Sequence, residues 1–199
     1  MKSVFAALMF GSMTILALPS SAQRVKLAEG DLKPLAGQKE INLEFVYSDM
    51  KVGKMSEADY VKKKKDEYNK KEAGKGDAWE KAWMEDRETR YEPRFIQSFT
   101  QFSGMTGGPI ASAKYTAIVK TVFVEPGYNI AITRKNAEVN LEILIVETAN
   151  KSHVIGKITC DKSPGGSFWE NDFDTGERIA EAYKNAGMSV GGLIRSKAN

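Results

Sequence analysis

The strongest constraint on the fold is the stretch from Glu138 to Asp161, in which apolar and polar residues alternate on both sides of a short polar turn. A period of two is that of a β-strand with one buried face. The alternating apolar positions are Val139, Leu141, Ile143, Ile145, Val154, Ile158 and Cys160. The stretch therefore predicts an antiparallel hairpin at the centre of a sheet.

Two segments farther from this hairpin can extend the sheet. Residues 41–47 alternate apolar and polar side chains, which predicts a strand with one buried face. Residues 115–124 are a dense run of apolar and β-branched residues on both faces, which predicts an interior strand. A short strand or an extended loop is expected at residues 130–133.

The C-terminal segment from Thr175 to Ile194 predicts a helix that covers the sheet. Its apolar residues recur at intervals of three and four, and they are Ile179, Tyr183, Ala186, Val190 and Leu193. Asp174, followed three residues later by Glu177, predicts the N-terminal cap of this helix.

Residues 56–103 predict three helical pieces. Ser56, with an acidic residue three positions later, is the pattern of a helix N-cap. Asp77 predicts the cap of a second helix after a glycine break, and Pro93 interrupts or restarts that helix. From Phe95 onward, aromatic and aliphatic residues return at helical spacing, so a third piece is expected to pack on the sheet.

Together these elements predict an α+β fold with a mainly antiparallel sheet of about four or five strands and helices packed mainly on one face. Residues 23–199 are expected to form a single domain. Within it, residues 23–39 contain Gly30, Pro34 and Gly37 and show no sustained periodicity, so they are expected to be a surface arm.

The first 22 residues have the pattern of a signal peptide. Lys2 precedes an apolar run from Val4 to Leu18, and small residues follow Pro19, which predicts cleavage after Ala22. No cysteine follows the run to carry a lipid, and no later segment approaches the ~20 apolar residues of a transmembrane helix. The expected location is exported, either periplasmic or extracellular, with no transmembrane segment after signal removal.

Charge and composition exclude several classes of function. The net charge of +3 becomes +2 when Lys2 is removed with the signal, whereas a nucleic-acid binder needs a concentrated basic face. The chain has one cysteine and one histidine, so it forms no internal disulfide and lacks the ligands of most zinc sites. We therefore expect no nucleic-acid partner, no metal and no cofactor.

Several chemically capable residues have simpler structural interpretations. His153 lies beside the hairpin turn without a nucleophile motif, which favours a surface histidine. Cys160 shares the apolar face of its strand, which favours a buried, unreactive thiol. Trp79 and Trp83 lie four residues apart on one helix face, which favours a place in the core. The lysine run at 62–65 has acidic neighbours that dilute its field, which favours a solvated helix face.

Trp169, Tyr128 and Arg134 are the candidate binding residues; no catalytic residue is assigned. Trp169 follows a glycine-rich turn and precedes the acidic run 170–174. An exposed aromatic ring at such a place stacks on a sugar ring or on a protein partner. The acidic run does not have the register of a calcium loop and is better explained as helix-start chemistry.

The order of elements from Tyr115 onward resembles that of a known class of proteins. A strand, the turn Pro126–Gly127, Arg134, the long hairpin and a final helix together resemble small exported bacterial envelope proteins of unknown function, in particular the periplasmic domain of the curli-secretion lipoproteins. The resemblance implies a sheet covered by helices and a role in assembly or binding without catalysis.

The favoured function is that of an exported, non-enzymatic envelope protein that binds a protein or glycan partner. The alternative is a carboxylate-dependent hydrolase acting on extracellular glycan, because paired carboxylates are defined by their separation in space and not by sequence. A hydrolase requires two carboxylates that converge in a cleft, whereas a binding protein shows an aromatic or apolar patch without them.

Overall fold

The structure is a computed structural model that describes residues 23–130, 133–166 and 174–198. Its centre is the predicted hairpin, formed by β9 (Ala137–Glu147) and β10 (Asn150–Gly165). The two strands pair antiparallel, with Ile143 opposite Ile158 and Leu141 opposite Cys160. All four of these side chains are buried, so the alternation identified the core-facing positions in this part of the hairpin. The prediction that Val154 lies on the same face is wrong: its side chain is 49% exposed, and the strand register shifts between Val154 and Gly156.

The main sheet has eight strands and mixed directions. Six of them follow the order β1 (Arg24–Gly30), β10, β9, β6 (Tyr115–Glu125), β2 (Glu40–Val46) and β5 (Thr106–Gly108). The short strands β3 (Lys51–Val52) and β4 (Met55–Ser56) pair beside this path. The α+β class is thus confirmed, whereas the prediction of four or five mainly antiparallel strands is wrong.

The parallel pairs have a physical cause in the chain order. β2 pairs parallel with both β6 and β5, and β3 also pairs parallel with β6. Parallel neighbours need a long crossover, and the helices between residues 57 and 103 supply it. Three of the strands that were not predicted, β3, β4 and β5, have only two or three residues, too few to produce a visible alternation in the sequence.

Residues 23–39, expected as a surface arm, instead contribute an edge strand and part of the core. β1 pairs antiparallel with β10, and its register shifts between Leu27 and Glu29. Leu32 and Leu35, around the short 3₁₀ turn η1 (Lys33–Leu35), are buried. Arg24, Lys26 and Glu29 are exposed on β1. Charged side chains and a register shift are features that discourage further pairing at a sheet edge.

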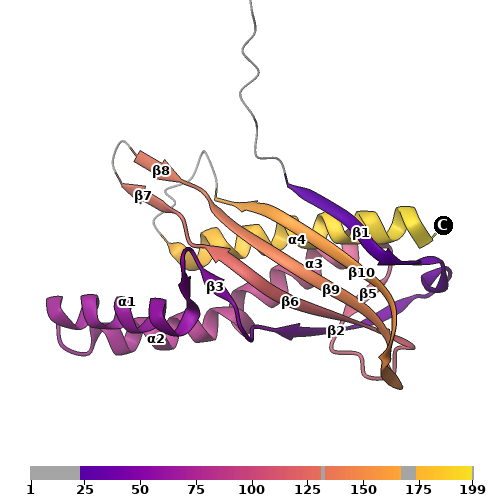
Figure 1. Cartoon of the computed structure of the whole chain (residues 1–199), viewed down its shortest axis with the longest axis horizontal. Coiled ribbons are helices and arrows are strands. Elements are labelled where there is room, and N and C mark those ends of the chain that lie inside the picture. The colour runs from indigo at the N-terminus through magenta and orange to yellow at the C-terminus, as the bar shows by residue number, and fades with distance from the viewer. Residues whose placement is uncertain (1–22, 131–132, 167–173, 199) are drawn as a thin grey trace, which may run out of the picture.

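Two helices form an arm that extends beyond the end of the sheet (Figure 1). They are α1 (Glu57–Lys71) and α2 (Lys75–Asp86), and we refer to them together as the arm. Ser56 caps α1 as predicted, since its Oγ accepts a hydrogen bond of 3.1 Å from the Asp59 amide. α2 begins at Lys75, behind a left-handed Gly74, so Asp77 lies in its first turn and does not cap it.

A π-helical turn, η2 (Arg87–Tyr91), joins α2 to α3 (Glu92–Ser103). Pro93 lies in the first turn of α3, where its missing N–H costs no helical hydrogen bond. The backbone stays right-handed helical from Asp86 to Glu92, so Pro93 marks the change from the π-helical turn to α3 without a break in the chain of helical residues. Its Phe95 and Phe99 are fully buried.

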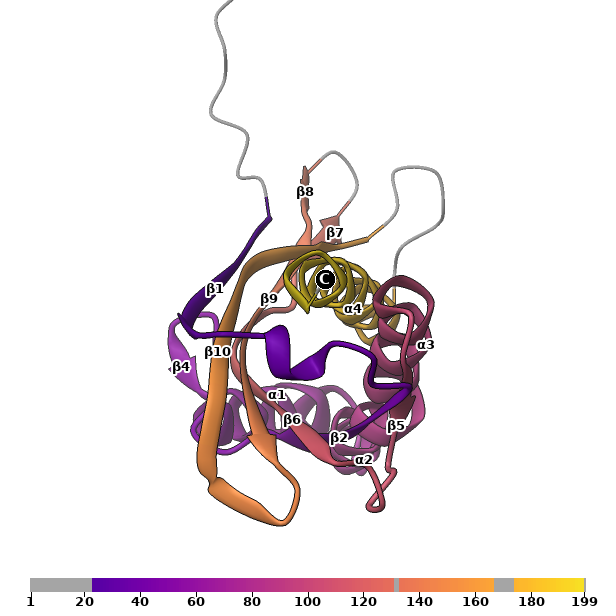
Figure 2. The ribbon, with the colours of Figure 1, turned by 90° about the vertical axis from the view of Figure 1, so that its right-hand side faces the viewer.

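The last helix, α4 (Thr175–Ala198), covers the sheet as predicted. Its buried stripe includes Ile179, Tyr183, Ala186 and Val190, each at most 1% exposed. The fifth predicted member, Leu193, is only partly buried, and Ile194 next to it is fully buried instead. The Asp174 carboxylate accepts a hydrogen bond from the Gly176 amide (2.8 Å), which confirms its place at the helix start. Figure 2, viewed along α4, shows α3 and α4 side by side on the concave face of the curved sheet. Among the described residues, no helix is long and apolar enough to cross a membrane.

Candidate functional site

A second, two-stranded sheet stands away from the main sheet (Figures 1 and 2). It consists of β7 (Tyr128–Ile130) and β8 (Thr133–Lys135), paired antiparallel with Tyr128 opposite Lys135 and Ile130 opposite Thr133. Alternate residues of a strand share a face, so these four side chains lie on one face of the hairpin. Tyr128 is 43% exposed and Ile130 is 64% exposed, so this face is open to solvent.

The base of this hairpin is fixed to the body of the molecule. The Glu125 carboxylate accepts hydrogen bonds from Lys135 Nζ (2.6 Å) and from the Gly127 amide (3.1 Å). The hydrogen bond to Glu125 raises the pKa of Lys135, which keeps the ammonium charged. From α4, the buried Arg178 donates through Nε to the carbonyl oxygen of Pro126 (3.2 Å). The exposed face is therefore presented on an anchored support.

The three predicted binding residues have different outcomes. Tyr128 lies on the exposed face of the β7–β8 hairpin. Arg134 lies on the same hairpin but on its opposite face, because it pairs with Asn129 and alternates with Lys135. Trp169 lies outside the described residues. The structure thus brings Tyr128 and Arg134 onto one element without joining them in one surface.

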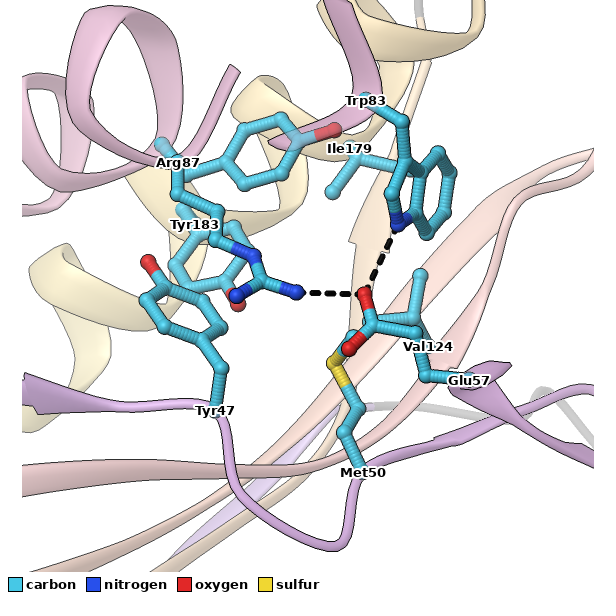
Figure 3. Close-up of a pocket in the computed structure, with 9 residues that line it drawn as sticks. Tyr47, Met50, Glu57, Trp83, Arg87, Val124, Ile179 and Tyr183 are labelled. Atoms are coloured by element: carbon cyan, nitrogen blue, oxygen red, sulfur yellow. Dashed lines mark hydrogen bonds and ion pairs between the residues drawn. The ribbon is translucent and has the colours of Figure 1, made fainter. Parts of the chain in front are cut away.

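A second candidate is a small enclosed pocket at the root of the arm (Figure 3). Its volume of about 10 Å³ is the space of roughly one water molecule. The lining comes from the arm, the turn η2, the sheet and α4, and comprises Tyr47, Met50, Glu57, Trp83, Arg87, Tyr91, Val124, Ile179 and Tyr183.

The carboxylate of Glu57 organises the arm side of this pocket. Its Oε1 accepts hydrogen bonds from Arg87 Nη2 (2.5 Å) and from Trp83 Nε1 (2.7 Å), as Figure 3 shows. The Arg87 guanidinium also lies 4.6 Å from the ring centroid of Tyr47, within the range of a cation–π contact. The Glu57 carboxylate and the Arg87 guanidinium therefore connect four parts of the chain: α1, α2, η2 and the segment after β2.

Buried phenols form the body side of the pocket. The rings of Tyr91 and Tyr183 stack with centroids 5.1 Å apart, and the Tyr183 hydroxyl lies 2.5 Å from Thr121 Oγ1. The Tyr47 hydroxyl donates to Glu92 (3.3 Å). Burial raises the pKa of Tyr47, Tyr91 and Tyr183 far above the usual value, so all three stay protonated at neutral pH. Tyr47 and Tyr183 are thus held by hydrogen bonds, whereas the buried Tyr91 hydroxyl has no hydrogen-bond partner among the described residues.

Three carboxylates lie around Arg90 of η2. Its guanidinium contacts Asp86 (3.0 Å), Asp174 (2.8 Å) and Glu177 (3.7 Å). Burial raises the pKa of Asp86. Burial would also raise the pKa of Asp174, but the hydrogen bonds from Arg90 and the Gly176 amide outweigh it and lower that pKa. The cluster ties η2 to the first turn of α4.

The other singled-out residues follow their structural interpretations. His153 is exposed, and its Nδ1 lies 3.3 Å from Glu147. Cys160 is buried, and burial raises its pKa to about 11. Trp83 is buried and stacks on Trp79 with centroids 5.5 Å apart.

The lysine run 62–65 lies on α1 and pairs with acidic residues of both arm helices, as a solvated face of mixed charge does. In residues 23–130, 133–166 and 174–198, no group of three or more histidine, cysteine or acidic side chains is arranged to hold a metal ion.

Comparisons with known proteins identify no family for this chain. No protein-family model matches it, and no curated protein matches it in sequence. Similar solved structures include the PelC dodecamer from Paraburkholderia phytofirmans, which is 11% identical with a TM-score of 0.38 over 83% of this chain and 98% of PelC. Protein XCC0632 from Xanthomonas campestris, of the family DUF330, is 13% identical with a TM-score of 0.35 over 78% of this chain and 80% of its own. The resemblance to curli-secretion lipoproteins stays a prediction.

The network of Glu57, Trp83 and Arg87 was missed in the sequence. Glu57 lies 26 residues from Trp83 and 30 from Arg87, so no local spacing connects them. A partial signal existed, because Trp83 and Arg87 are four residues apart on one helical face and therefore share a neighbour.

Proposed function

We propose that this chain is an exported, non-enzymatic envelope protein that binds a protein or glycan partner through the exposed face of the β7–β8 hairpin. The observation that carries the proposal is the joint exposure of Tyr128 and Ile130 on an anchored hairpin that stands clear of the main sheet. An apolar surface held out from the body is a common mark of an interaction site.

The chemistry of the hairpin face suits a partner with both apolar and polar groups. Covering a large aliphatic side chain such as Ile130 contributes about 1.5–3 kcal/mol. The ring of Tyr128 offers a flat apolar surface with a hydroxyl at its tip, which suits a sugar ring or a protein surface. Lys135 on the same face adds a cation beside the ring.

A site-specific photo-crosslinker at Ile130, in cells that secrete the protein, tests this surface directly. The matched control is Val154, which is 49% exposed on the turn side of another hairpin. We expect a discrete cross-linked partner from position 130 and none from position 154. Tyr128→Ala should lower affinity for that partner, or for a glycan found on an array, about tenfold. Equal cross-linking at both positions would refute the assignment of the hairpin.

Export is tested separately. The signal-peptide pattern predicts a mature N-terminus at Gln23, which N-terminal sequencing or the intact mass of the secreted protein reads directly. A mature chain that retains residues before Pro19 would contradict the prediction.

The alternative is a carboxylate-dependent hydrolase of extracellular glycan. Its structural support is the approach of Asp86, Asp174 and Glu177 to one another around Arg90. In such an enzyme one carboxyl group with a raised pKa acts as the acid, and burial raises that of Asp86. Release of reducing ends from purified cell-wall glycan, abolished by Asp86→Asn in a variant that remains folded, would favour this alternative.

A further inference from the structure

Strand β1 forms one edge of the main sheet (Figures 1 and 2). It pairs with β10 on one side, and no strand of the described residues pairs with it on the other. The backbone N–H and C=O groups on that side of its seven residues are therefore open to a further strand. The edge at the other end of the sheet, β5, has only three residues, two of them glycines. β1 is thus the longer open edge.

The side chains of β1 alternate between the two faces of the sheet. Val25 and Leu27 face the core but are only partly buried, because β1 has a neighbour on one side alone. Lys26 and Glu29 are exposed on the other face, since the register shift after Leu27 brings Glu29 onto the face of Lys26. A further strand would complete the cover of the two apolar side chains.

The charges of Lys26 and Glu29 have no partner within the part of the chain that the structure describes. Neither side chain takes part there in an ion pair or a hydrogen bond. Lys157, which lies opposite Glu29 on β10, is paired instead with Glu142 at 3.1 Å. Both charges are therefore available to a second chain.

A second copy of β1 carries the complementary charges. If the two strands pair antiparallel about a two-fold axis at Leu27, the Leu27 side chains of the two copies lie opposite each other. With Ala28 bulged as it is against β10, Lys26 of each copy then lies opposite Glu29 of the other. Two opposite-charge pairs form by symmetry. Shifting the register by two residues would instead place Lys26 opposite Lys26 or Glu29 opposite Glu29, and like charges repel.

We propose that β1 is a dimer interface, at which the β1 strands of two copies pair antiparallel and join their main sheets. The charges that discourage pairing with an arbitrary strand specify this partner and this register. The contact is isologous, so the assembly closes at two. β1 spans only about 23 Å at ~3.3 Å per residue, so the interface is small and the dimer is expected to be reversible. The β7–β8 hairpin takes no part in it, so the two proposals fail independently.

Sedimentation velocity of the mature chain at concentrations from about 1 to 200 µM tests the dimer. We expect a concentration-dependent dimer that raised salt weakens, because salt screens exposed charges. Lys26→Glu and Glu29→Lys each turn both ion pairs into like-charge pairs, so each should weaken dimerisation about tenfold or more without lowering the melting temperature. Lys54→Glu is the control, since Lys54 is an exposed lysine between β3 and β4 and its replacement changes the net charge equally.

A mixture of the two variants tests the pairing of residues. In a dimer of one Lys26→Glu chain and one Glu29→Lys chain, both contacts again join opposite charges, so the mixture should dimerise about as tightly as the parent. Lys54→Glu mixed with Glu29→Lys is the control, because the net charges are the same but one contact still opposes two lysines. A parent chain that stays monomeric at every concentration, a dimer insensitive to Glu29→Lys, or a first mixture that dimerises no more tightly than the control mixture would each overturn the proposal.

Discussion

A Cβ atom on Gly187 of α4 would lie 2.4 Å from Oγ of Ser98 on α3. The same position is 2.5 Å from the carbonyl oxygen of Phe95. Four residues later, a Cβ on Gly191 would lie 2.9 Å from the carbonyl oxygen of Phe99. The two glycines therefore allow the backbones of α3 and α4 to approach closely along one line of contact.

Gly187→Ala should consequently destabilise the protein. The added methyl group meets backbone that cannot move without shifting α3, and overpacking of this kind costs about 1–3 kcal/mol. Gly192→Ala is the matched control, because nothing lies within 4 Å of its Cβ position and alanine favours a helix by up to ~1 kcal/mol. Urea denaturation measures both. An equal gain in stability from the two substitutions would show that the helices do not pack as described.

The sequence predicted the long elements, in which the hydrophobic period repeats several times. The hairpin of β9 and β10, the interior strand β6 and the apolar stripe of α4 each extend over many residues, so their periods are visible. Strand order and direction were not predictable, because they depend on pairing between distant segments. Gly187 is an example. From the sequence alone, a glycine at this position only lowers the helix propensity of the segment, whereas its role in the close packing of α4 on α3 depends on where α3 lies.

The candidate site was less predictable than the fold. Tyr128 was identified and is exposed, but Ile130 beside it was missed, since sequence does not reveal that a short hairpin leaves the main sheet. The bond between Glu57 and Arg87 joins residues 30 apart and depends on the turn η2. Contacts of this kind are set by tertiary structure, and no period of the sequence records them.

Glu57 and Arg87 should show a large interaction free energy in their contribution to stability. Both side chains are largely shielded from solvent, at 16% and 22% exposure, so removing one charge leaves the other with poor solvation. Glu57→Gln should lower the free energy of unfolding by about 1–3 kcal/mol and alter the fluorescence of Trp83, whose Nε1 donates to the same carboxylate.

A double-mutant cycle distinguishes a direct interaction between Glu57 and Arg87 from unrelated destabilisation by each substitution. Glu57→Gln combined with Arg87→Met should cost less than the sum of the two single changes. Asp66→Asn is the control, because its pair with Lys62 is exposed and should contribute nothing measurable. Strict additivity at positions 57 and 87 would argue against a direct bond.

Ile179 should be essential to the core. The side chain is fully buried between α4 and its neighbours, so Ile179→Ala removes packed atoms and leaves a cavity. We expect a loss of ~2–5 kcal/mol in chemical denaturation. Lys184→Ala, on the exposed side of the same helix, should leave the free energy of unfolding unchanged. A parent-like Ile179→Ala chain would mean that α4 is peripheral.

Cys160 should make the protein less stable in alkaline solution. Burial raises the pKa of its thiol to about 11 in the folded chain, against 9.0 for the ordinary group. Below pH 9 both states keep the proton and the thiol introduces no pH dependence. Between about pH 9 and 11 the unfolded chain loses the proton more readily, so stability falls as pH rises, by ~2–3 kcal/mol in total. Cys160→Ala should remove this part of the pH dependence, measured by denaturation between pH 7 and 10.5.

The thiol of Cys160 should also react with a thiol reagent far more slowly in the native chain than in the unfolded chain. Fast labelling of the native chain would show that β1 and β10 do not shield the thiol.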